Sequence, residues 1–193
     1  YLPGPTGKGM SAGDRSSRAA HLAAGRVRAE VPNVGRSYSV EFWFWNGLPN
    51  DAHAITAYLF SRAANDSATE PVDQLGITGG KTSPGRLFFS NGDLRKQPLE
   101  SQTTIEPKTW NHLVAIRDGD QVRAYLNGAS FPAFADHLPP ATQTAGNTWL
   151  FGGRSDNRAG LEGKLSDIAI YDRALSAEEI ANHYAAAGVP PNQ

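Results

Sequence analysis

The chain has 193 residues, of which 39% are hydrophobic and 19% charged, and its net charge is −1. This composition fits one globular domain, and its near-neutral charge argues against nucleic acid or anionic membranes as partners. No apolar run approaches the roughly 20 residues that cross a bilayer, so no membrane insertion is expected. The absence of cysteine excludes disulfides and thiolate chemistry. The first residues, Tyr1 to Gly4, show no initiator Met and no signal-peptide pattern, so we expect a segment of a longer polypeptide.

The chain divides into three stretches. Residues 1–18 are rich in Gly, Pro and Ser and predict an N-terminal coil or linker, 19–188 form one domain, and 189–193 form a C-terminal tail. Within the domain, short segments rich in β-branched and aromatic residues recur between turn signals, which is typical of an all-β sandwich or barrel. These segments are 26–31, 38–45, 55–62, 73–78, 85–90, 110–117, 121–127, 148–152 and 164–171.

Turn residues favour antiparallel pairing of these strands. Asn91-Gly92, Asp118-Gly119 and Asn127-Gly128 each offer residues that tolerate the positive φ of a tight turn. No segment with a helical period separates consecutive strands, so a parallel sheet with crossover helices is not expected.

One helix is well specified, over 177–187. Ser176 and Glu179 have the spacing of a capping box, and Leu175 and Ile180 that of a hydrophobic staple. Gly188 then ends the helix. We expect a short amphipathic helix that packs against the sandwich.

The strand before this helix should have one buried face. Alternation in 164–172 places Ile168 and Ile170 on that face. Arg173 follows the strand, where we expect it to bind backbone carbonyls or a carboxylate such as Asp167 or Asp172.

Three stretches carry a resemblance to a known family. They are Tyr38 to Phe44, the hairpin from Trp110-Asn111-His112-Leu113-Val114 to Asn127-Gly128, and the segment from Gly163 through Tyr171-Asp172-Arg173-Ala174-Leu175-Ser176 to Ile180. In this order they resemble the laminin-G-like jelly-roll domains of the concanavalin A-like lectin/glucanase superfamily. The resemblance implies an all-β fold, a two-sheet antiparallel β-sandwich (jelly roll) with one short C-terminal α-helix. It also implies a secreted, periplasmic or cell-surface location, with other domains of the same polypeptide as neighbours.

The aromatic strand 38–45 offers candidate ligand contacts. Alternation separates Val40, Phe42 and Phe44, which we expect in the core, from Trp43 and Trp45 on the other face. An outward indole can stack on a sugar ring. The alternative is that Trp43 and Trp45 are themselves core residues.

Two polar loops add amides and carboxylates at strand ends, over 46–51 and 152–158. Such groups suit sugar hydroxyls or Ca²⁺, although ordinary turn chemistry also explains them. Calcium binding is therefore left open. The candidate ligand-binding set is Trp45, Asn50, Asp51, Arg154, Asp156 and Asn157.

The acidic residues do not form the pair that glycoside hydrolysis needs. Hydrolases of this fold generally set acids in an E-x-D-x-x-E arrangement on one strand, and no such spacing occurs here. No catalytic residue is predicted. The sequence thus favours a non-catalytic carbohydrate-binding or adhesion module that binds a glycan or a cell-surface or extracellular protein. The alternative is a structural spacer or protein-docking module without a small-molecule ligand.

Overall fold

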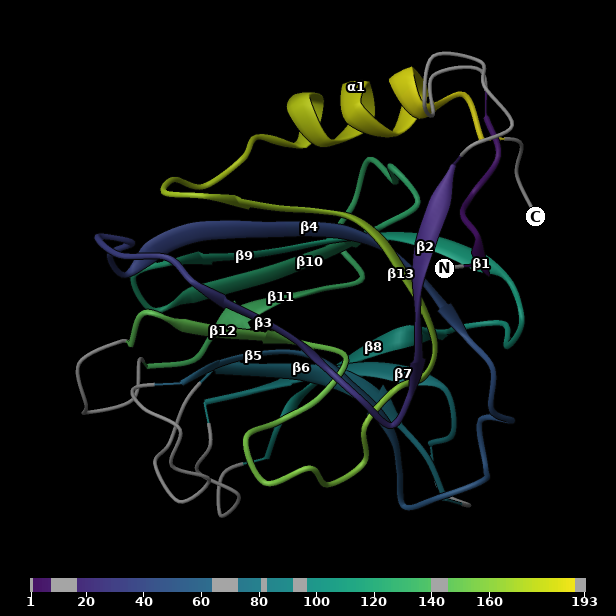
Figure 1. Cartoon of the computed structure of the whole chain (residues 1–193). Coiled ribbons are helices and arrows are strands. Elements are labelled where there is room, and N and C mark those ends of the chain that lie inside the picture. The colour runs from purple at the N-terminus through teal and green to yellow at the C-terminus, as the bar shows by residue number, and fades with distance from the viewer. Residues whose placement is uncertain are drawn as a thin grey trace.

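The computed structural model shows two antiparallel sheets stacked face to face, with one helix on the outside (Figure 1). It describes residues 2–7, 17–63, 73–80, 83–91, 97–139 and 146–189. One sheet has seven strands in the order β1-β2-β13-β4-β9-β10-β11, and the other has six in the order β3-β12-β5-β6-β7-β8. The expected β-sandwich with one C-terminal helix is confirmed.

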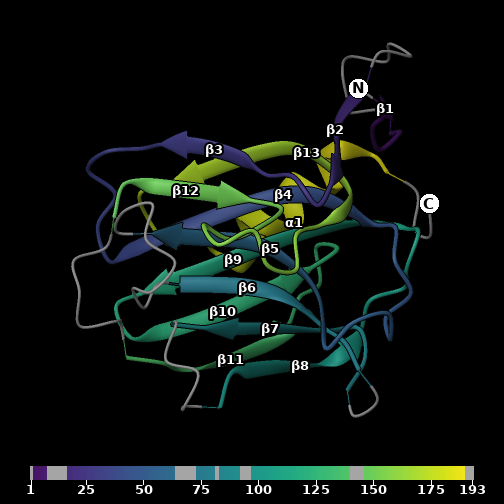
Figure 2. The same cartoon turned by 60° about the horizontal axis from the view of Figure 1, so that its bottom comes forward.

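Every pairing in both sheets is antiparallel. The strands of the larger sheet are β1 (Leu2–Pro3), β2 (Arg18–Ala23), β13 (Glu162–Tyr171), β4 (Ser37–Asn46), β9 (Trp110–Asp118), β10 (Gln121–Leu126) and β11 (Phe134–His137). Those of the smaller sheet, whose order Figure 2 shows, are β3 (Val27–Glu30), β12 (Thr148–Phe151), β5 (Ile55–Ala63), β6 (Asp73–Thr78), β7 (Arg86–Ser90) and β8 (Leu99–Thr104).

All nine strand segments expected from the sequence are present, with bounds within two residues of the expected ones. The sequence analysis missed β1, β2, β8 and β11. Three of these four lie at a sheet edge, where strands are short or polar and leave a weak pattern. In the stretch expected to be coil, residues 2–3 pair with β2, while 8–16 lie outside the described residues. The Asn91-Gly92 turn is also outside, because Gly92 is not among the described residues.

The core lies between the two sheets. Val40, Phe42 and Phe44 are completely buried there, as alternation in β4 predicts. Ile168 and Ile170 also pack against this core, although both are only half-buried. A β-bulge between Ser166 and Ala169 interrupts simple alternation in β13.

A buried ionic network closes one end of the sandwich. The Arg117 guanidinium donates to both oxygens of Asp73, at 2.5 and 2.6 Å, and to the carbonyl oxygens of Gly119 and Leu138. The Tyr38 hydroxyl donates to Asp73 at 2.7 Å. Burial and the nearby carboxylate raise the pKa of Tyr38 well above its usual value. The charges of Arg117 and Asp73 therefore have their partners inside the protein.

Helix α1 (Ala177–Ala187) begins and ends where the sequence predicts. The Ser176 side chain accepts from the backbone N–H of Glu179, the Glu179 carboxylate accepts from that of Ser176, and Gly188 is left-handed with φ of 61°. Arg173 binds the carbonyl oxygen of Ala174 and a carboxylate, as expected, but the carboxylate is that of Glu179 and not of Asp167 or Asp172. Both carboxylate oxygens of Glu179 accept from Arg173, because the first helical turn brings Glu179 back to it. Hydrogen bonds from Arg173 and from the Ser176 backbone lower the pKa of Glu179 to about 2.

Candidate functional site

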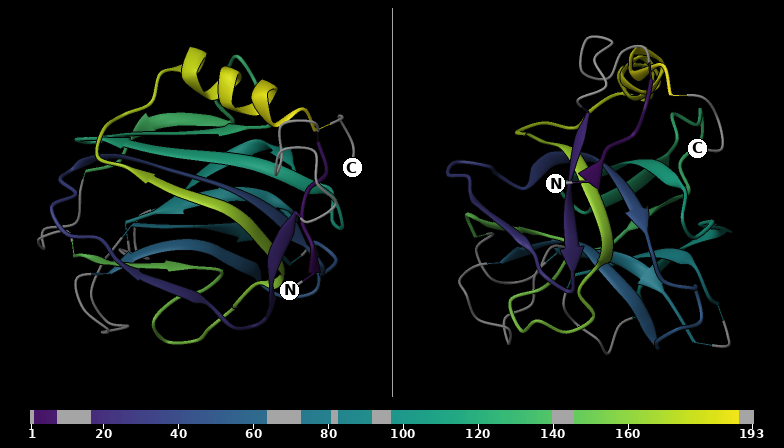
Figure 3. Two further views of the ribbon diagram at one scale, coloured as in Figure 1. Left: turned by 45° about the horizontal axis from the view of Figure 1, so that its top comes forward. Right: turned by 45° about the vertical axis from the view of Figure 1, so that its right-hand side comes forward.

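The two outer faces of the sandwich are covered differently. Helix α1 lies over the outer face of the seven-stranded sheet (Figure 3). Leu175 and Ile180 pack there against Val114, Ile116 and Tyr125. The six-stranded sheet has no such cover among the described residues.

A carboxylate fastens the helix to the seven-stranded sheet. Glu41 on β4 is 8% exposed, and its carboxylate lies 2.7 Å from His112 Nε2 and 2.9 Å from His183 Nδ1 on α1. The Tyr171 hydroxyl donates to it at 2.9 Å. Burial alone would raise the pKa of Glu41, but the hydrogen bonds from His112, Tyr171 and His183 outweigh burial and lower it. Burial of Tyr171 and its hydrogen bond to Glu41 raise the pKa of Tyr171 to about 12.

Trp43 belongs to this covered face. It points away from the sheet-sheet core, as alternation predicts, yet it is only 4% exposed because Tyr184 of α1 stacks on it at 5.7 Å. Both readings of Trp43 are thus partly right: it faces outward and is buried by the helix. His112, 1% exposed, also lies against its ring at 5.1 Å. These side chains hold α1 in place.

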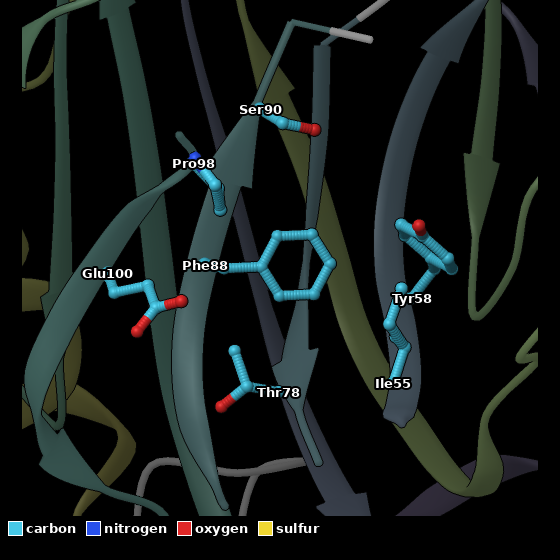
Figure 4. Close-up of a pocket in the computed structure, with 7 residues that line it drawn as sticks. All are labelled: Ile55, Tyr58, Thr78, Phe88, Ser90, Pro98 and Glu100. Atoms are coloured by element: carbon cyan, nitrogen blue, oxygen red, sulfur yellow. The ribbon is translucent and has the colours of Figure 1, made fainter. Parts of the chain in front are cut away.

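The opposite face contains a pocket of about 220 Å³ (Figure 4). Its lining comes from β5, β6, β7, β8 and the residues just before β8. The lining residues are Ile55, Tyr58, Thr78, Phe88, Ser90, Pro98 and Glu100. Phe88 points out of the core, because its neighbours Leu87 and Phe89 both belong to the core cluster.

Two largely buried aromatic residues, Tyr58 at 2% exposed and Phe88 at 6%, form the apolar wall of this pocket. Tyr58 and Phe88 meet edge to face, with ring centroids 5.5 Å apart. They can meet because Gly76 lies between them on β6, paired with both residues. A Cβ atom on Gly76 would lie 2.6 Å from the Phe88 ring. Glycine at position 76 therefore makes room for the aromatic wall.

The polar groups of the pocket differ in how they are used. The Thr78 hydroxyl is committed to the backbone, since it donates to Ser83 and accepts from the Arg86 N–H. In the part of the chain that the structure describes, the Glu100 carboxylate and the Ser90 hydroxyl have no hydrogen-bond partner. Glu100 projects beside Phe88 (Figure 4). A carboxylate and a hydroxyl next to an apolar wall can bind a ligand with hydroxyl groups on an apolar ring.

Arg154, on the loop after β12, supports the pocket from its side. Its Nη1 donates to the Tyr58 hydroxyl at 3.0 Å, and its guanidinium lies 4.9 Å from the centre of the Tyr58 ring. Its Nη2 pairs with Asp156 at 2.9 Å. Arg154 therefore fixes the Tyr58 ring, and Asp156 fixes Arg154.

The predicted ligand-binding residues do not form one site. Arg154, Asp156 and the exposed Asn157 share a loop on the six-stranded side, whereas Trp45 lies on the outer face of the seven-stranded sheet. Asn50 donates to the carbonyl oxygen of Ile105 at 2.7 Å, which is a structural bond; its own Oδ1 is buried without a partner in the described part of the molecule. Asp51 is exposed beside it. Ligand contact by these residues stays a prediction.

The sequence analysis missed Tyr58, Phe88 and Glu100. Alternation within 85–90 contains the signal for Phe88, because it separates Phe88 from the core residues Leu87 and Phe89. Simple alternation within 55–62 would place Tyr58 on the same face as the core residue Phe60, and a β-bulge between them changes this. Glu100 carries no local signal, since β8 itself was missed.

Within the described ranges, no group of three or more His, Asp and Glu side chains is arranged to hold a metal ion. The one helix that the structure describes, α1, has 11 residues, which is too short to cross a membrane.

The two stacked antiparallel sheets define a β-sandwich. A family model matches residues 19–181 of the chain. It represents a laminin-G-type family, described as the concanavalin A-like lectin/glucanases superfamily, and the chain belongs to this family. A search of curated proteins finds no match.

Solved structures share the fold at low sequence identity. Domain 4 of AbnA, an extracellular arabinanase from Geobacillus stearothermophilus in complex with arabinotriose, is 18% identical with a TM-score of 0.66; the match covers 88% of this chain and 77% of that one. The SAP-like pentraxin from Limulus polyphemus is 22% identical with a TM-score of 0.59, covering 81% and 73%. The botulinum neurotoxin serotype G binding domain is 15% identical with a TM-score of 0.59, covering 86% and 41%.

Proposed function

We propose that this domain is a non-catalytic carbohydrate-binding module whose pocket on the six-stranded sheet binds one sugar residue. The observation that carries the proposal is the combination of the Tyr58 and Phe88 rings with the uncommitted oxygens of Glu100 and Ser90. Sugars present apolar C–H faces beside hydroxyl groups, and aromatic rings with nearby acceptors match both.

The size of the pocket sets how much of a glycan it can take. Its volume of about 220 Å³ lies below the roughly 300–1,000 Å³ of pockets that enclose drug-sized ligands. One monosaccharide unit fits, and the rest of a longer chain would extend into solvent. The arabinotriose complex of the AbnA domain, which has the same fold, supports this proposal for a glycan ligand.

The described lining of the pocket does not contain the acid pair that glycosidic hydrolysis requires. Hydrolysis uses two carboxyl groups about 5 to 10 Å apart on either side of the bond. Among the described residues that line the pocket, Glu100 is the only acid. We therefore assign Glu100 to hydrogen bonding with sugar hydroxyls. The proposal includes the extracellular location that the family resemblance implies, within a larger polypeptide.

A glycan array, probed with and without Ca²⁺, would identify the ligand class. Calorimetry with the strongest neutral glycan should then give a dissociation constant in roughly the micromolar to millimolar range. Glu100→Gln should weaken binding about 10-fold, because hydrogen bonds to a charged acceptor contribute about 1.5 to 3 kcal/mol. Glu106→Gln, at an exposed position outside the pocket, is the matched control and should bind like the wild type.

Two results would count against the proposal. If no glycan binds under either condition, the spacer or docking module becomes the better account. If Glu100→Gln and Glu106→Gln bind the glycan equally well, the binding site lies elsewhere on the domain.

A further inference from the structure

Four side chains form a row across the outer face of the seven-stranded sheet, beyond the C-terminal end of α1. His21 on β2 pairs with Lys164 on β13, Lys164 with Trp45 on β4, and Trp45 with Trp110 on β9. Directly opposed residues of antiparallel strands point to the same side. The row spans three strand spacings, about 14 Å.

Lys164 holds the centre of this row. Its ammonium lies 4.5 Å from the ring centre of Trp45 and 5.5 Å from that of Trp110. Trp45, Trp110 and Lys164 are all half-buried, whereas His21 is exposed. The cation is thus partly withdrawn from water on top of two indole rings.

Among the described residues, this row has no anionic partner. Within the described part of the chain, Lys164 forms no ion pair and the indole N–H groups of Trp45 and Trp110 form no hydrogen bond. Glu162 is exposed two residues before Lys164 on the same strand but does not pair with it. The row therefore presents an ammonium, two indole N–H donors and an imidazole that have no acceptor in the described part of the chain.

We propose that this row is a second ligand site, which binds an oligosaccharide bearing carboxylate groups, such as a chain of uronic acids. A carboxylate reaches Lys164 from the solvent side while the ammonium keeps its contacts with the indoles. The exposed parts of Trp45 and Trp110 then lie against the sugar rings, and their N–H groups donate to hydroxyl oxygens. The row is long enough for an oligosaccharide, unlike the pocket on the opposite sheet, and does not depend on that pocket.

Tryptophan fluorescence provides a direct readout of this site. The chain has four Trp, of which Trp43 and Trp149 are 4% and 0% exposed, so a ligand on the surface can perturb only Trp45 and Trp110. The probe is a trimer of galacturonic acid, compared with the neutral galactose trimer. The acidic trimer should change the emission of the wild type and the neutral trimer should not. The affinity should fall as salt is added, because the contact with Lys164 is a charge pair near the surface.

Variants then locate the binding. Lys164→Met should weaken binding of the acidic trimer about 10-fold, the effect of losing one charge-assisted hydrogen bond. Arg158→Met removes an exposed cation from the loop after β12 and should have no effect. Glu100→Gln should also have no effect, which separates this site from the proposed pocket.

Three results would overturn the proposal. They are no fluorescence change with the acidic trimer, an equal response to the neutral trimer, and an equal response to tetraglutamate, which would show that the row binds any carboxylate chain. The wild-type titrations decide between these outcomes even if Lys164→Met fails to fold.

Discussion

Two glutamates on opposite outer faces of the sandwich differ in role. Glu41 is a buried carboxylate that holds the helix on the sheet, and Glu100 lines the proposed ligand pocket. Glu41 lies under α1, where two imidazoles and a phenol surround its carboxylate. Glu100 lies in the pocket of the opposite face, where its carboxylate has no hydrogen-bond partner among the described residues. Both belong to the same type of structure, a strand of a sandwich with its other face on the core. The difference lies in whether the rest of the chain has supplied partners for the charge.

The largest effect on stability should follow from removing the buried carboxylate of Glu41. Glu41→Ala leaves His112 and the Tyr171 hydroxyl without their acceptor beneath the helix and should lower the free energy of unfolding by about 3 kcal/mol. Urea denaturation at neutral pH measures this loss. Glu100→Ala is the matched control on the opposite face, and a comparable loss in both variants would contradict the distinction between them.

The same carboxylate predicts a pH dependence of stability. Because the pKa of Glu41 is lower in the folded protein than the usual 4.5, ionised Glu41 stabilises the fold at pH values above 4.5. This contribution is lost as the pH falls through the folded pKa. The stability difference between the wild type and Glu41→Gln should therefore shrink below pH 4.5. A difference that stays constant down to pH 2 would show that Glu41 does not titrate in this way.

A smaller effect is expected at the start of the covering helix. Ser176→Ala removes the side-chain acceptor of the Glu179 N–H and should cost about 1 kcal/mol, within the usual range for an N-cap. Thermal unfolding measures it, with Ser155→Ala in the loop after β12 as a control. An unchanged melting temperature would mean that the cap contributes little to holding α1.

The smallest effect on stability should come from the pocket. Glu100→Ala removes a side chain without a described partner, so its free energy of unfolding should change by less than about 0.5 kcal/mol. Its glycan affinity should nevertheless fall. A variant that loses stability and affinity together would indicate that Glu100 has a structural role.

Much of the fold could be predicted because its signals are local. Alternation in β4 separates Phe42 and Phe44 from Trp43, and the capping box specifies α1 within its true bounds. The edge strands β8 and β11 escaped because neighbouring strands in the sheet, rather than their own sequences, define them.

The candidate site was harder to predict because it is assembled from distant parts of the chain. Tyr58, Phe88 and Glu100 come from three strands, and Arg154 reaches Tyr58 from a loop nearly one hundred residues further on. Polar loops next to an aromatic strand were visible in the sequence, but the structure places Trp45 and Arg154 on opposite sides of the sandwich. Only pairing register and sheet order decide which side chains share a face.

The central claim is that a neutral glycan binds in the pocket on the outer face of the six-stranded sheet. Amide chemical shifts in an NMR titration with the glycan that the array identifies test it most directly. The largest changes should fall on Gly76, Thr78, Ser90 and Glu100, with little change at Trp45, Lys164 and the residues of α1. Changes centred on Trp45 and Lys164, with none around the pocket, would contradict it.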